Sequence, residues 1–343
     1  MYCGWGGFLK TFAVQPQFSF ASIFMRRLDM FRYFCKRLLW MIPIILAVSI
    51  VVFTLMMFCP GDPAEIILGS TALEQDLAAK RTELGLDDPY LIRLGRFLYE
   101  TFVKFDLGTS WSNNVKISEL IAERLPRTIV LTAVTFTIAF GIGIPLGVIA
   151  ATHQNRWQDH LSMVLALVGV SIPNFWLALL LVILFSLKLG WLPALGVGGI
   201  EYYILPALAG STGATANAAR QTRSSMLDVI RSDYMTTARA KGVPEKDVVI
   251  KHGLKNALIP IITMMGTQFG RMLGGAMVLE TIFSIPGMGT LIINGVNNRD
   301  YPVVEIGSIF LAIVFSFCML LVDMMYAAVD PRIKAQFARH GKK

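Results

Sequence analysis

Long stretches without Asp, Glu, Lys or Arg recur along the whole chain. Five apolar stretches of this kind are 17 to 28 residues long, and a sixth contains Arg271 as its only charged residue. A bilayer core is crossed by about 20 apolar helical residues. The pattern therefore predicts an all-α membrane protein with six transmembrane helices, near residues 38–58, 128–150, 161–187, 203–219, 257–279 and 304–327.

The basic residues predict how these helices are oriented. With the N-terminus in the cytoplasm, the inside segments carry 20 of the 31 Lys and Arg residues. Because cytoplasmic loops are enriched in Lys and Arg, both termini are predicted to be cytoplasmic. Residues 62–127 then form a long outside loop, and residues 220–256 form the most polar inside loop.

Composition excludes several other classes of protein. Hydrophobic residues make up 55% of the 343 residues and charged residues 16%, against about 25% charged in an average soluble domain. Four widely spaced cysteines, without a CxxC pair, predict neither a disulfide framework nor a zinc site. The four histidines include no HExxH pair, so no metal is expected. The net charge of +8 forms no basic stripe on a soluble face, and no nucleic acid is expected as a partner.

Small residues predict where helices pack closely. Between residues 207 and 219, all but Leu208 and Asn217 are Ala, Gly, Ser or Thr, so this span is predicted to be buried among other helices. Glycines also repeat every four residues in two other spans: Gly143 and Gly147, and Gly266, Gly270 and Gly274. Such faces serve helix packing, or line a path that opens and closes, or both.

The outside loop contains three amphipathic segments, at residues 73–84, 91–105 and 115–125. In the last one, Ile117, Leu120, Ile121 and Leu125 follow helical spacing. This segment is a candidate for a helix that lies flat on the membrane surface.

The cytoplasmic segment 220–256 is too long for a simple connection. It is mostly helical in pattern, with a break at Gly242, Val243 and Pro244 between two short helices. Such a segment forms a compact knob suited to docking a soluble partner.

This segment resembles the cytoplasmic coupling loop of ABC-importer permeases. Only Ala238, Gly242 and Leu254 match the general form of that loop, but DYMTTARAKG followed by HGLKNALIP closely resembles the variant in permeases for dipeptides, oligopeptides and nickel. Other stretches look like the same branch, among them CPGDPAEII, LGLDDPYLIRLGRF, GIPLGVIAA, SIPNFWLALLLVILFSLKLGWLPALG, ETIFSIPGMGTLI and LLVDMMYAAVDPRI. The resemblance covers residues 30–335 and implies a type I-like importer permease. Residues 1–29 are interpreted as a variable tail, or as a stretch upstream of a natural start at Met30, and residues 336–343 as a C-terminal tail.

The resemblance implies a set of partners and a location. These are a second related permease, one or two cytoplasmic ATPase subunits, an extracytoplasmic substrate-binding protein and the bilayer of a bacterial cytoplasmic membrane. The chain has no G-x-x-x-x-G-K-[ST] phosphate loop, so ATP is expected to be used by the partner subunits, and no cofactor is expected on this chain. The ATPase contact is predicted at Tyr234, Thr236, Thr237, Ala238, Arg239, Ala240, Lys241 and Gly242.

Ionisable groups at membrane depth are costly and tend to face a polar path or a partner. Arg271, Gln268, Asn174 and Asp323 are the candidates for the translocation path. Arg271 has two interpretations: it meets a peptide carboxylate, or it forms a structural pair with Asp323 or with the partner permease. Two further acidic residues, Glu280 and Asp300, are alternative docking points for a binding protein.

The expected function is inward transport of dipeptides or oligopeptides by alternating access, with no catalytic residue on this chain. Nickel, glutathione-like thiols and sugars remain alternatives within the same family. A secondary transporter is a rival, although no clear inverted repeat is present. An integral membrane enzyme is a weaker rival because no nucleophile or HExxH motif is present.

Overall fold

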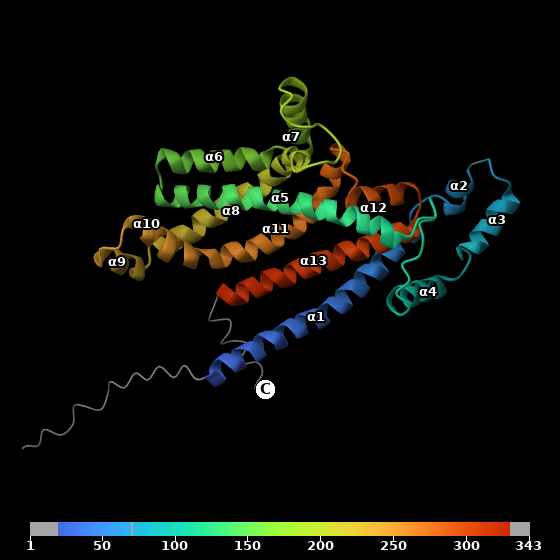
Figure 1. The fold of residues 1–343 in the computed structure, drawn as a ribbon, viewed down its shortest axis with the longest axis horizontal. Helices are drawn as coiled ribbons and strands as arrows, with labels where there is room; N and C mark the ends of the chain where they lie inside the picture. Colours follow the sequence, from blue (N-terminus) through green and yellow to red (C-terminus); the bar gives the residue numbers. More distant parts are fainter. Residues whose placement is uncertain (1–19, 70, 330–343) are drawn as a thin grey trace, which may run out of the picture.

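The computed structural model describes residues 20–69 and 71–329, and this part of the chain is helical with no strand of its own. The long helices lie side by side, and two small groups of short helices occupy opposite ends (Figure 1). The elements are α1 (Phe20–Met57), α2 (Pro63–Leu68), α3 (Glu74–Glu83), α4 (Tyr90–Phe102), α5 (Ile117–Thr152), α6 (Trp157–Ser171), α7 (Asn174–Leu181), η1 (Val182–Lys188), α8 (Glu201–Ile230), α9 (Asp233–Ala240), α10 (Glu245–Asp247), η2 (Val248–Leu254), α11 (Lys255–Ile282), α12 (Met288–Asn297) and α13 (Tyr301–Val329).

Four segments of the described chain are long and apolar enough to cross a membrane: Phe34–Met57, Ile117–Thr152, Glu245–Ile282 and Tyr301–Met324. A bent pair, α6 with α7 and η1, makes a fifth if it counts as one span. Helix α8 is 30 residues long but is rich in Ala, Gly, Ser and Thr, and it is not among these segments. The six predicted spans thus correspond to four apolar helices, one bent pair and one helix of low hydropathy.

The predicted continuous span at residues 161–187 is broken. Helix α6 ends at Ser171, and the next helix leaves it at an angle of 98° (Figure 1). The break falls at Ile172 and Pro173, where Ile172 has an extended backbone with ψ of 124°. Proline has no N–H to donate and disfavours the helical conformation of the residue before it, which explains the bend.

Helix α8 occupies the position that its small residues predict. It packs against α5, α6, α7 and α11. At Gly143 of α5, a Cβ atom would lie 2.6 Å from Ala218 Cβ and 2.7 Å from Thr215 O, and at Gly147 it would lie 2.5 Å from Ala219 O. The two backbones therefore approach so closely that only glycine fits on α5 at these two positions.

The glycine stripe of α11 has two different environments. A Cβ atom at Gly266 would meet Val322, and one at Gly270 would meet Phe315, so both glycines pack against α13. Gly274 and Gly275 have nothing within 4 Å of a built Cβ atom. The stripe therefore serves helix packing at one end and borders open space at the other.

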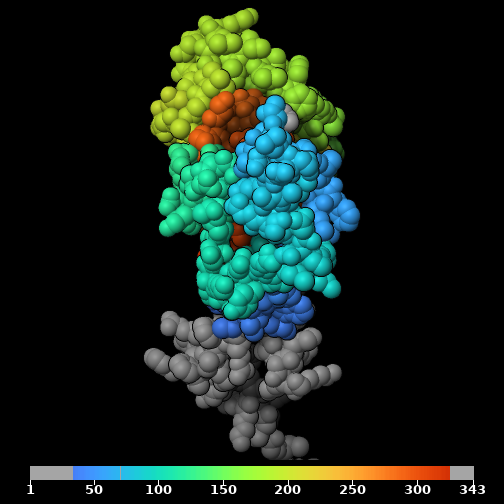
Figure 2. All heavy atoms as spheres, turned by 90° about the vertical axis from the view of Figure 1, so that its right-hand side faces the viewer, coloured from blue at the N-terminus to red at the C-terminus, as the bar shows by residue number. Residues whose placement is uncertain are grey.

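Two acidic residues, Asp62 and Asp300, anchor the predicted outside loop through their hydrogen bonds. Asp62 caps α2 by accepting from the Ala64 N–H at 2.9 Å, and it also pairs with Arg81 of α3 at 2.6 Å. Asp300, just before α13, accepts hydrogen bonds from the Ser110 hydroxyl and from the Trp111 and Ser112 N–H groups. These contacts tie α2 to α3 and hold the segment before α5 at one end of the long helices (Figure 2).

Residues 115–125 do not form a separate surface helix. From Ile117 onward they are the first turns of α5, which continues through Pro126 into the apolar segment. Ile117 and Ile121 are buried in a cluster with Met288 and Ile306. The 3-4 spacing that predicted a helix on the membrane surface instead packs this end of α5 against α12 and α13.

We predict that Gly147→Ala destabilises the protein by about 1–3 kcal/mol, because the added methyl group overpacks the α5–α8 contact. Gly141→Ala on the same helix is the matched control, since nothing lies within 4 Å of its built Cβ atom. The control should be neutral or slightly stabilising because Ala favours helix over Gly. Thermal unfolding of both purified variants in detergent checks this, and equal unfolding temperatures would contradict it.

Candidate functional site

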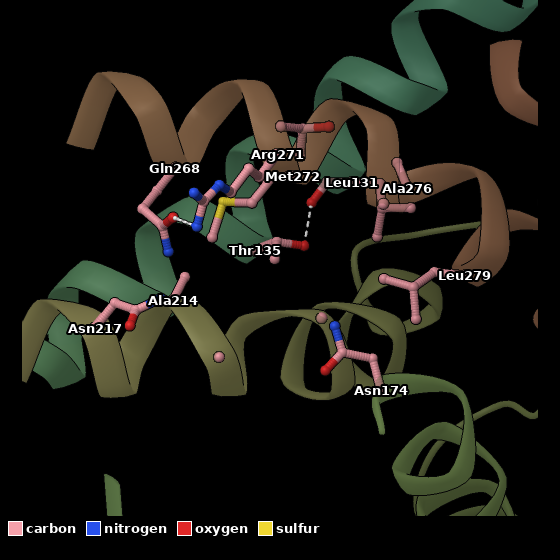
Figure 3. A pocket seen from close by; sticks show the side chains of 14 residues that line it. Leu131, Thr135, Asn174, Ala214, Asn217, Gln268, Arg271, Met272, Ala276 and Leu279 are labelled. Carbon is pink, nitrogen blue, oxygen red and sulfur yellow. Dashed lines mark hydrogen bonds between the residues drawn. The ribbon is translucent and has the colours of Figure 1, made fainter. Parts of the chain in front are cut away.

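A polar cavity lies between α5, α7, α8 and α11 (Figure 3). It has a volume of about 220 Å³. Three of the predicted path residues line it: Arg271, Gln268 and Asn174. The other lining residues are Leu131, Thr132, Thr135, Gly210, Gly213, Ala214, Asn217, Met272, Gly275, Ala276 and Leu279.

Arg271 and Gln268 lie one turn apart on α11 and point toward α8 (Figure 3). Arg271 Nη1 lies 3.4 Å from Gln268 Oε1, a long hydrogen bond that leaves most donors of the guanidinium for other partners. Gln268 is buried, whereas Arg271 is exposed in the single chain. The cavity therefore holds a positive charge that no carboxylate of its own lining neutralises.

Asn174 reaches the cavity because the bend after Pro173 places the first residue of α7 beside α8. Its Oδ1 lies 3.4 Å from the hydroxyl of Thr212 on α8. Thr132 of α5 lines the same cavity, and its buried hydroxyl has no hydrogen-bond partner among the described residues. Thr132 is a cavity residue that the sequence did not single out, because threonine in an apolar helix usually bonds to its own backbone.

A second hollow of about 380 Å³ continues from the first toward the α9 end of the molecule. The two hollows share Asn217, Gln268 and Arg271. Arg220 also lines the second hollow, and its Nη2 donates to Asn217 Oδ1 at 2.6 Å. Neither lining contains Asp or Glu, so two arginines determine the charge of the connected hollows.

Asp323 lies elsewhere. It is on α13, where Arg37 Nη1 of α1 lies 2.9 Å from its Oδ2. The structural pair between Arg271 and Asp323 is therefore absent, and Asp323 does not line either hollow. Arg37, 286 positions away in the sequence, supplies the positive charge that Asp323 faces.

The predicted coupling loop forms a knob of two short helices, α9 and α10, at the end of α8 and η2. Gly242 ends α9 with a φ of +76°, a conformation that favours glycine. Arg239 and Glu245 join the two helices across this turn, with Nε to Oε2 at 3.0 Å and Nη2 to Oε1 at 2.9 Å. The Glu245 carboxylate raises the pKa of Arg239 above its ordinary value through these hydrogen bonds.

The knob has a buried side and an exposed side. Met235, Ala238 and Val248 are buried together and pack against the last turns of α8. The remaining predicted coupling residues are exposed: Tyr234, Thr236, Thr237, Arg239, Ala240, Lys241 and Gly242. The buried side of α9 thus packs the knob against α8, and the opposite side of α9 is exposed.

An ion pair that the sequence did not reveal fixes α6 to α8. Asp159 is 2% exposed, and its two oxygens accept from Arg223 Nε and Nη2, each at 2.6 Å. Asp159 also accepts from the Asn155 N–H at 3.0 Å. The sequence shows both residues at the ends of predicted spans, but their separation of 64 positions gave no signal that they meet.

The two acidic residues considered as docking points are both buried. Glu280 accepts from the Thr128 hydroxyl at 2.5 Å and from the Thr290 N–H at 3.0 Å, so it joins α11 to α5 and caps the start of α12. Asp300 is buried in the outside loop by the bonds described above. Both are structural residues, and neither is exposed to a binding protein.

Comparison with known proteins identifies two family models on this chain. "Binding-protein-dependent transport system inner membrane component" matches residues 143–335, and the N-terminal model of the same transport systems matches residues 30–132. The glutathione transport system permease protein GsiC of Salmonella paratyphi A is 44% identical over 305 residues, covering 89% of this chain and 99% of that protein. The GsiC protein of Escherichia coli strain K12 is 43% identical over the same length.

Among solved structures, the fold resembles an inward-facing MetNI methionine ABC transporter. The TM-score is 0.54 at 19% identity, and the match covers 62% of this chain and 97% of that one. A second crystal form of MetNI gives a TM-score of 0.53. At this identity the likeness concerns the fold alone.

Proposed function

This chain belongs to the family of binding-protein-dependent transport system inner membrane components, and from that premise we propose that it carries peptide-like anionic solutes inward across a bacterial inner membrane. It is a permease subunit of an ABC importer, a transport component whose energy comes from ATPase partners. The observation that supports an anionic solute is the charge of the two connected hollows: Arg220 and Arg271 line them, and no carboxylate does.

The charge of the hollows favours some solutes over others. A guanidinium recognises a carboxylate through paired N–H donors, and this interaction is strengthened where water is excluded. Short peptides carry a terminal carboxylate, and glutathione, for which the GsiC relatives are named, carries two. Nickel is a cation and prefers His, carboxylate or thiolate ligands, and no group of three or more such residues is found in the described part of the chain. A peptide or glutathione-like solute is therefore the better fit.

The hollows also support a path shared between two permeases. They lie along α8 and α11, and Gly213 and Gly275 line the first hollow with open space where a Cβ atom would lie. In our proposal a second, related permease supplies the opposite wall. Alternating access then follows from movement of the two permeases against each other, with a binding protein delivering the solute from outside.

The coupling loop supports the route by which ATP drives this movement. Its buried side is packed against α8, and η2 continues directly into α11. A force applied to the exposed side of α9 is therefore transmitted to the two helices that carry the cavity. We place this knob and both termini in the cytoplasm because residues 220–256, which contain the knob, hold eight basic residues.

A secondary transporter is the weaker alternative. It needs an ion-coupling carboxylate in the path, and the two connected hollows contain none. Asp323, the acidic residue among the predicted path residues, faces Arg37 instead.

Uptake in cells tests the solute class. In cells lacking this gene, uptake of labelled glutathione or of di- to pentapeptides should fall and should return when the gene is restored. Radioactive nickel, measured in the same strains, should be unaffected. If nickel uptake alone follows the gene, the solute proposal is wrong although the importer architecture stands.

Replacing Arg271 tests carboxylate recognition within the path. Hydrogen bonds to charged groups contribute about 1.5–3 kcal/mol, so Arg271→Gln should raise the half-saturating solute concentration or lower the uptake rate by about 10- to 100-fold. The loss should be much smaller for a peptide whose terminal carboxylate is an amide. Arg156→Gln, at an exposed arginine before α6, is the matched control. Equal losses for the free and amidated peptides would refute the role.

Replacing Tyr234 tests the ATPase contact. Tyr234 is 43% exposed on α9, so Tyr234→Ala leaves the buried side of the knob intact. In proteoliposomes with the partner subunits, we expect solute-stimulated ATP hydrolysis and uptake to fall at least tenfold. Tyr99→Ala, at a tyrosine 53% exposed on α4 at the opposite end, should stay within about twofold of the unchanged protein. Unaltered hydrolysis and uptake in Tyr234→Ala would place the contact elsewhere.

A further inference from the structure

A separate cavity lies at the opposite end of the molecule from the coupling knob. It has a volume of about 370 Å³ and is lined by α1, the end of α3, α4, the segment before α5 and the start of α13. It shares no lining residue with the two connected hollows. In Figure 2, orange-red residues from late in the chain are visible deep in a gap between the blue-green elements of the outside loop.

Glu305 of α13 is the unusual residue of this cavity. It lines the cavity and is only 6% exposed. No hydrogen bond or ion pair joins its carboxylate to another residue of the described chain. Arg93 shares the lining and lowers the cost of the charge from a distance, but its own hydrogen bond goes to the Leu86 carbonyl at 3.4 Å. A buried carboxylate without a partner is costly, so a cation in the cavity would stabilise it.

The other lining residues suit an organic cation. Phe53 and Phe97 stack with ring centroids 5.4 Å apart, and Trp111 and Tyr301 are paired at the same distance. Four carboxylates and two guanidiniums line the cavity. Arg96 is already paired with Asp88 at 2.5 Å, and Glu83 is already paired with Lys80 at 2.8 Å. Aromatic faces attract cations, and the Arg93 guanidinium already lies 6.0 Å from the centroid of the Phe53 ring in this cavity.

We propose that this cavity binds a primary ammonium group, with Glu305 as its counter-ion. Two sources carry that chemistry: the headgroup of an aminophospholipid and the N-terminus of a short peptide. The outward side of α4 favours the lipid, because Leu91, Ile92 and Val103 are more than half exposed, an arrangement typical of a helix lying in a membrane interface. The proposal stands on the geometry of this cavity and does not depend on the solute that the protein transports.

The experiment uses the purified full-length chain and native mass spectrometry with phosphatidylethanolamine as the probe. The unchanged protein should retain this lipid, and Glu305→Gln should retain at least tenfold less. Glu119→Gln, at an exposed glutamate outside the cavity, is the matched control and should retain the lipid normally. A phosphatidylethanolamine whose amine is acetylated should bind no better to the unchanged protein than to Glu305→Gln.

A second experiment tests a peptide N-terminus as the ammonium group, with Ala-Ala-Ala and its N-acetylated form as probes and the shift in the thermal unfolding temperature as the readout.

Binding that needs both the free amine and Glu305, in either experiment, supports the proposal and identifies the source of the ammonium group. Equal binding of free and acetylated probes, or retention unaltered in Glu305→Gln, overturns it. Glu305→Asp keeps the charge and should recover part of the binding, which separates loss of the counter-ion from loss of the fold. If Glu305 serves only to neutralise the charge of Arg93, Glu305→Gln and Glu305→Asp will change the unfolding temperature without changing ammonium binding. The proposal then fails.

Discussion

The close contact between α5 and α8 is the constraint on which the rest of the structure depends. Gly143 and Gly147 let the two backbones approach to a distance at which no other residue fits on α5. Helix α8 needs such a neighbour because its Ala, Gly, Ser and Thr side chains offer little apolar surface to lipid. Once α8 is held inside the bundle, its polar residues Asn217 and Arg220 can face an internal hollow instead of the bilayer. The site is thus a consequence of how α8 is packed.

Charges inside the bundle divide into two kinds. Asp159 with Arg223, and Glu280 with Thr128, are satisfied by the chain itself and hold helices together. Arg271 has only a long bond to Gln268, and its charge faces open space. Because an ionisable group at membrane depth is costly unless it is paired, an incompletely satisfied charge such as that of Arg271 points to function.

The sequence predicted those features that depend on neighbours along the chain. Uncharged length predicted the apolar helices, small residues predicted the burial of α8, and Gly242 with Pro244 predicted the break in the knob. The bend at Pro173 was missed because the apolar run continues through it, although the X-Pro pair is a local signal. Features that depend on distant partners were not predictable: Asp323 faces Arg37, Asp300 holds residues 110–112, and residues 115–125 pack against α12 and α13. Amphipathic spacing predicted a helix there but not which surface would cover its apolar side.

Because α5 is long, its glycine contact with α8 lies much nearer to one end of the helix than to the other. At 1.5 Å per residue, its 36 residues extend about 54 Å, well beyond a hydrocarbon core of about 30 Å. The glycine contact lies near one end: Gly147 is about 8 Å along the axis from Thr152, and about 45 Å from Ile117. A rod that pivots at such a point moves its long arm about six times as far as its short arm. A small swing of the end nearest the knob about this contact would therefore become a larger displacement of the elements packed around Ile117.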